Sequence, residues 1–109
     1  MSEMRRIDLK DIASWHGRNA PELASRGVES RLVGPTVGRS KDSAAVEFIS
    51  PEYLVAATVW DSGESEVITA FVQGDDDPIV TVQDLADSEA IIALIEHIAL
   101  ELTAKRNGD

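Results

Sequence analysis

The sequence predicts a single α+β domain over residues 1–109: an N-terminal helix pair, an antiparallel four- to five-stranded meander sheet, and a long C-terminal helix packed on one face. Apolar residues recur at helical spacing near both ends, and runs rich in Val, Ile, Ala and Thr fill the middle. Short turns separate these runs, which favours antiparallel pairing. One sheet face then packs on the helices, and the other is either solvated or an interface.

The first quarter of the chain is expected to form two helices. Apolar residues recur at three- and four-residue spacing from Leu9 to Trp15, and Gly17 has the character of a helix stop. A second start follows, because Asn19 can cap a helix and Pro21 suits a first turn. The prediction is a bent helix pair.

The middle of the chain is expected to form strands, with the hairpin of residues 53–73 at the centre of the sheet. Val46 and Phe48 should point inward and Glu47 outward, because side chains alternate along a strand. Gly63 supplies the permissive backbone for the hairpin turn. The expected strands are 30–37, irregular or at an edge because of Gly34 and Pro35, then 44–49, 53–61, 66–73 and 79–82.

The last element is an amphipathic helix. Asp84, Asp87 and Ser88 are candidate caps, and acidic residues crowd the expected first turn. The apolar stripe that should face the sheet consists of Ile91, Leu94 or Ile95, Ile98 and Leu102, widened by Ile92 and Ala99.

The distribution of charge divides the chain, whose formal net charge is −10. Eight basic and five acidic residues precede Asp42, whereas residues 42–104 contain fourteen acidic residues and no Lys or Arg. Such a segment repels itself unless its charges face water or a cationic partner, and it is unsuited to nucleic acid. A salt-adapted or merely solvated surface is one interpretation. Eight of the ten basic residues precede Asp42, and this confinement favours the other interpretation, an acidic face that docks on a basic protein.

Composition and motifs favour binding over catalysis. The chain has no cysteine, no phosphate loop and no Gly-x-Ser-x-Gly elbow, and its two histidines, His16 and His97, are far apart in sequence. We therefore expect no enzyme activity, no cofactor and no metal. The sequence contains neither a signal-peptide pattern nor an apolar stretch that could span a bilayer, so a cytoplasmic protein without membrane contact is expected.

The candidate partner-binding residues lie in and beside two predicted turns: Trp60, Asp61, Glu64, Glu66, Asp75, Asp76 and Asp77. Tryptophan is a frequent interface anchor, although packing in the core is an alternative for Trp60. Glu64 and Glu66 should share one face of a strand. The three consecutive aspartates fit a solvated turn or a partner contact better than a calcium loop, whose ligands stand at alternate positions.

The run of residues 51–66, PEYLVAATVWDSGESE, resembles the central segment of bacterial polymorphic-toxin immunity proteins of the TriTu type. In that group a strand ends in Trp, and a Gly turn and an acidic residue follow. The resemblance implies a protein without catalytic residues, encoded beside a cognate toxin that it binds and blocks, and we expect it to be a monomer rather than a dimer. Acidity suits a cationic toxin, of which a nuclease is one class. The alternative is a small acidic dimeric secretion chaperone for an effector protein.

Overall fold

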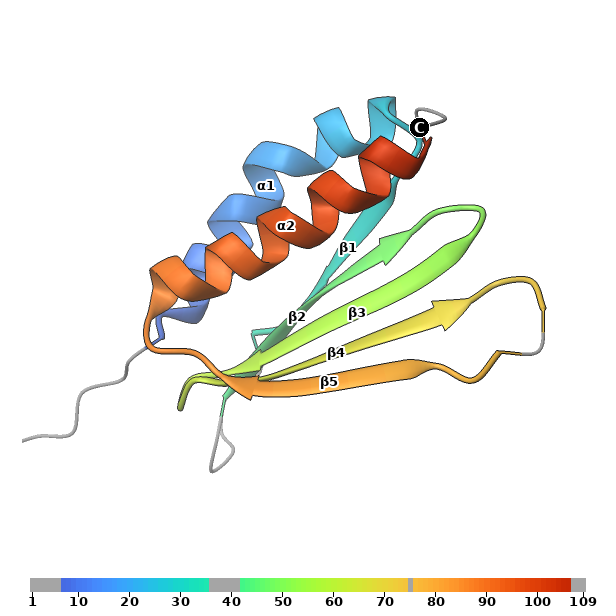
Figure 1. The fold of residues 1–109 in the computed structure, drawn as a ribbon. Helices are drawn as coiled ribbons and strands as arrows, with labels where there is room; N and C mark the ends of the chain where they lie inside the picture. The colour runs from blue at the N-terminus through green and yellow to red at the C-terminus, as the bar shows by residue number, and fades with distance from the viewer. Residues whose placement is uncertain (1–6, 36–41, 75, 107–109) are drawn as a thin grey trace, which may run out of the picture.

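The computed structural model describes residues 7–35, 42–74 and 76–106 and shows an α+β fold with the helices on one side of the sheet (Figure 1). The sheet is an antiparallel meander in the order β1-β2-β3-β4-β5, which confirms the predicted architecture. The elements are α1 (Leu9–Ser25), β1 (Glu29–Val33), β2 (Ser43–Ile49), β3 (Tyr53–Trp60), β4 (Glu64–Phe71), β5 (Ile79–Asp84) and α2 (Ser88–Arg106).

The prediction of an N-terminal helix pair was wrong, because one 17-residue helix, α1, runs through both Gly17 and Pro21. Asn19, expected to cap a second helix, instead donates from its side-chain amide to the carbonyl oxygen of Trp15 at 2.8 Å. Trp15 and Leu23 are both buried on the same face of α1. A break between them would expose apolar surface, so tertiary packing outweighs the local breaking tendency of glycine and proline.

Apart from the end of β1, every strand boundary lies within two residues of its predicted position: β4 is shifted two residues toward the N-terminus, and β5 extends two residues further, to Asp84. β1 ends at Val33, before Gly34, and residues 36 and 37 of the predicted strand lie outside the described residues. β4 begins at Glu64, two residues early, because its hairpin turn contains three residues. In that turn the N–H of Gly63 donates to the carbonyl oxygen of Trp60 at 2.9 Å. The φ of Gly63 is 103°, which only glycine adopts without strain.

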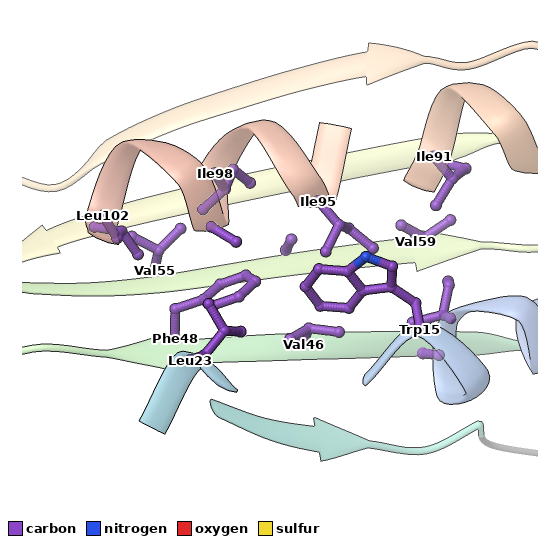
Figure 2. Packing of buried hydrophobic residues seen from close by; sticks show 14 of the residues in the cluster. Trp15, Leu23, Val46, Phe48, Val55, Val59, Ile91, Ile95, Ile98 and Leu102 are labelled. Carbon is purple, nitrogen blue, oxygen red and sulfur yellow. The ribbon is translucent and has the colours of Figure 1, made fainter. Parts of the chain in front are cut away.

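The hydrophobic core lies between the helices and the inner face of β2 and β3 (Figure 2). Val46 and Phe48 are both fully buried, as predicted from strand alternation. The ring of Trp15 on α1 meets Phe48 edge-on, with centroids 6.3 Å apart and planes at 74°. Ile91 and Ile95 on α2 are also fully buried, so the predicted apolar stripe of this helix does face the sheet.

The two helices run side by side in the same direction (Figure 1). At their N-terminal ends, the backbone N–H of Asp8 donates to Oγ of Ser88 at 3.0 Å, across 80 positions of sequence. Asp8 also caps α1, because its carboxylate accepts from the N–H of Lys10. The helices leave the last strand uncovered: all six residues of β5 are exposed.

Candidate partner-binding surface

The sheet has a second face that no helix covers, which we call the open face. On β3, Leu54, Ala56, Thr58 and Trp60 alternate with the buried residues and therefore point away from the helices. The strand registers extend this face across the sheet. Its residues are Glu29, Arg31, Val33, Ser43, Ala45, Glu47, Ile49, Leu54, Ala56, Thr58, Trp60, Glu64, Glu66, Ile68, Ala70, Val80, Val82 and Asp84.

The centre of the open face is apolar. Ile68 lies in register between Ala56 on β3 and Val80 on β5, which gives an apolar row across three strands. Leu54 is 46% exposed and Val82 is 68% exposed, although both are large hydrophobic residues. Contiguous apolar surface of this kind is uncommon on a protein that works alone and marks interaction sites.

Four of the seven sequence-predicted binding residues lie together at one end of the open face. Trp60 is half-buried at the end of β3, and Asp61 follows it in the turn. Glu64 begins β4, in register with Asp84 of β5. Glu66 is half-buried on the same face as Glu64, as predicted. An aromatic ring thus stands next to a group of carboxylates where the hairpin turns.

The predicted aspartates of the second turn lie at the opposite end of the sheet. Asp76 and Asp77 are exposed and precede β5, beyond the far end of β4. Asp75 lies outside the described residues. The eight residues of β4 separate the two turns, and at about 3.3 Å per residue they span roughly 23 Å. The structure therefore places the predicted residues in two groups, with the apolar row of the open face between them.

Among the described residues of the open face, the only basic one is Arg31, on β1. The Nε of Arg31 donates to Oε1 of Glu47 at 2.9 Å, across β1 and β2. Arg31 therefore balances Glu47. Three further acidic residues of the open face, Glu64, Glu66 and Asp84, lie on β4 and β5, and the sequences of these two strands contain no Lys or Arg.

Sequence reasoning missed the apolar part of this surface. Residues 53–60 contain no charged side chain, and residues 79–82 read Ile-Val-Thr-Val. Both runs lack the strict alternation of a strand with one solvated face, and that signal could have indicated Leu54, Val80 and Val82 as contact residues. The prediction chose the charged and aromatic residues beside the turns instead.

The helical side offers a shallow groove. Its volume is about 320 Å³, and its walls include Trp15, Asn19, Glu96 and Leu100. Along this groove Glu22 and Arg26 form an exposed ion pair at 3.0 Å. The described part of the chain contains no group of His, Asp or Glu side chains able to hold a metal ion.

The two histidines have separate structural roles. The ring of His16 lies 3.1 Å from Oγ of Ser30, which joins α1 to β1. The ring of His97 lies 3.4 Å from a carboxylate oxygen of Glu101, one turn along α2. Within the described ranges, neither helix is long and apolar enough to cross a membrane.

Comparison with protein families gives one match. The model of the family described as "Immunity protein TriTu" covers residues 10–99. This span begins inside α1, contains every strand and ends inside α2. No curated protein and no solved structure matches the chain.

Proposed function

Because the chain belongs to the TriTu immunity protein family, which neutralises a cognate toxin without catalysis, we propose that it binds that toxin with the open face of its sheet. The observation that carries this proposal is the apolar row of Ala56, Ile68 and Val80 in the uncovered sheet. Burial of such a row against a partner stabilises a complex by removing apolar surface from water. The helical face offers two open hollows, of about 320 and 420 Å³, whose walls are largely polar or charged.

Trp60 and the carboxylates around it would form the edge of the contact. Tryptophan is enriched among residues that dominate binding energy, and Trp60 is half-buried at the margin of the apolar row. Glu64, Glu66 and Asp84 add negative charge at the same end. A ring of polar groups around an apolar centre is the usual organisation of a protein interface.

The toxin surface that fits this face is cationic. The open face holds one basic residue in the described chain, Arg31, and Glu47 balances it. Charge complementarity accelerates encounter and disfavours acidic partners. A nuclease is one class of toxin with a surface of this sign. The same charge excludes nucleic acid as the direct partner of this face.

We further propose that the protein is a cytoplasmic monomer before it meets the toxin. The absence of cysteine agrees with a reducing compartment. Membership of an immunity family favours toxin neutralisation over the alternative of a dimeric secretion chaperone. Sedimentation of the purified protein across a range of concentrations tests the monomer, because a stable dimer at low concentration contradicts it.

Two exposed leucines provide a matched test of the proposed face. Leu54 is 46% exposed on the open face, and Leu100 is 68% exposed on α2. We expect Leu54→Gln to weaken binding of the toxin encoded beside this protein by about tenfold, as for a central apolar contact. Leu100→Gln should leave both binding and the rescue of toxin-expressing cells unchanged. The opposite ranking would assign the contact to the helices.

A further inference from the structure

The last strand of the sheet has an open edge. Among the described residues, β5 pairs with β4 alone, and all six of its side chains are exposed. Ile79, Val80 and Val82 are each more than half exposed. An exposed apolar edge strand is a template for pairing with another chain.

The register identifies which backbone groups point outward. The N–H of Leu85, one residue beyond β5, donates to the carbonyl oxygen of Gly63 at 2.8 Å, so it faces β4. In an antiparallel pair, alternate residues direct both backbone groups to the same neighbour. Residues 79, 81 and 83 therefore also face β4. The N–H and carbonyl groups of Val80, Val82 and Asp84 face the open edge.

The two edges of the sheet differ in protection. β1 carries Glu29 and Arg31, and α1 packs against it. Charged side chains and helical cover both discourage an edge from pairing. β5 has no charge before its last residue, Asp84, and no bulge interrupts its pairing with β4. The unpaired backbone groups of β5 are therefore available to hydrogen-bond with a strand of a partner.

We propose that β5 receives an extended segment of the toxin as an added strand, and that this segment is apolar in its middle and basic at both ends. The inference rests on the proposed function, since it assigns part of the toxin to this edge. Val80 and Val82 would contact the apolar middle from the open face, so the added strand continues the proposed interface. Main-chain hydrogen bonds would supply affinity, and side chains at alternate positions would supply specificity.

Charge at the ends of β5 identifies the occupant as basic. Asp76 and Asp77 precede the strand, Asp84 closes it, and all three side chains are exposed. Asp77 and Asp84 lie seven positions apart, about 23 Å in extended chain. Opposite charges paired across strands are favourable. The matching segment therefore carries Lys or Arg about seven positions apart.

A second copy of this chain fits the same edge poorly. Because even-numbered residues face the edge, antiparallel pairing of β5 with itself about Val80 would place Asp76 of one copy opposite Asp84 of the other, at both ends. Parallel pairing would place each aspartate near its own equivalent. Like charges directly opposite each other destabilise a strand pair in either orientation. Charge thus favours a basic partner over self-association.

Hydrogen exchange tests the added strand on the unmodified protein. The probe is the toxin domain encoded beside it, inactivated in its own catalytic residues. The amides of Val80, Val82 and Asp84 should exchange about tenfold or more slowly in the complex, because new hydrogen bonds would cover them. The amide of Thr81 already faces β4 and is the internal reference.

Two substitutions at one position separate the backbone from the side chain. Val82→Ala keeps the outward N–H, whereas Val82→Pro removes it without removing a bond to β4. We expect Val82→Pro to bind the toxin about tenfold more weakly than Val82→Ala. Asp77→Lys should weaken binding as well, because the occupant is basic. If the proline variant fails to fold, hydrogen exchange on the unmodified protein decides.

The outcomes distinguish this inference from the proposed function. Toxin binding with unchanged exchange at Val80, Val82 and Asp84 would overturn the added strand and leave neutralisation intact. Protection that grows with protein concentration in the absence of toxin would assign the edge to a second copy. Full toxin affinity in Asp77→Lys would contradict a basic occupant. Absence of any complex with the unmodified protein would overturn the proposed function itself.

Discussion

The indole nitrogen of Trp15 donates to Oε2 of Glu96 at 3.3 Å, and this contact joins the two helices. Trp15 is 2% exposed, so its N–H has little access to water except along the shallow groove that both residues line. A buried donor that loses its partner destabilises the folded state.

We expect Glu96→Ala to lower the free energy of unfolding by about 1 kcal/mol, because the groove lets water replace part of the lost bond. Glu96→Gln keeps an acceptor oxygen and should cost less. Urea unfolding followed by tryptophan fluorescence measures both. Equal stability of the alanine variant and the unmodified protein would show that water satisfies the indole completely.

The Trp15 ring also contacts Phe48, and substitution of Phe48 tests how tightly the core is packed. Its side chain is fully buried and meets the indole edge-on. Phe48→Ala should lower the free energy of unfolding by about 3–5 kcal/mol, since it leaves a cavity among rigid neighbours. Phe48→Leu should cost less, because it fills more of the same volume. A loss below about 1 kcal/mol for alanine would contradict the packing in Figure 2.

Gly17 provides a test of the continuous first helix. An added Cβ there has nothing within 4 Å, and the residue lies inside α1. Gly17→Ala should raise the free energy of unfolding by about 0.5–1 kcal/mol, because alanine loses less backbone entropy in a helix. Thermal and urea midpoints measure the gain. A lower midpoint would indicate that the helix breaks at Gly17 after all.

Gly74 is the matched control for that substitution. It also has open space around the Cβ position, but its φ is +95°. Gly74→Ala should therefore destabilise by about 1–2 kcal/mol, because an L side chain strains this backbone. The same glycine-to-alanine change should therefore raise the free energy of unfolding at Gly17 and lower it at Gly74. Steric contact of the added Cβ cannot explain the difference, because neither position has an atom within 4 Å of it.

The acidic end of the open face predicts a salt effect on association. The rate at which the protein binds its toxin should fall markedly as salt rises from about 20 to about 300 mM, because ions screen exposed charges. Glu66→Lys should reduce the low-salt rate severalfold. Glu101→Lys changes the net charge equally on α2 and should have a smaller effect. A rate independent of salt would refute electrostatic steering.

The order of elements could be predicted because each carries a strong local pattern. The apolar stripe of α2 and the alternation around Val46 and Phe48 identify buried faces without reference to any other part of the chain. The N-terminal error has the opposite cause. At Gly17 and Pro21 the local signals predict a break, and only packing of Leu23 beside Trp15 keeps the helix continuous.

The candidate surface was harder to predict than the fold. Charged residues such as Glu64 and Glu66 can be recognised as surface candidates from the sequence, and strand alternation correctly places them on the same face of β4. Whether Leu54 or Val82 is buried depends on which face of the sheet the two helices cover, and no local pattern contains that information. β5 is uncovered because two helices are not wide enough to cover a sheet of five strands, and β5 lies at its edge.

The hydrogen bond between Asp8 and Ser88 has a consequence for synthesis of the protein. Ile91, Ile95 and Leu102 complete the core, yet they emerge from the ribosome after every strand. At about 5–20 residues per second, several seconds separate the first helix from its partner. The nascent chain cannot close its core during that interval. The core therefore closes only after α2 has been synthesised, and a chain that stops before α2 cannot adopt the packing in Figure 2.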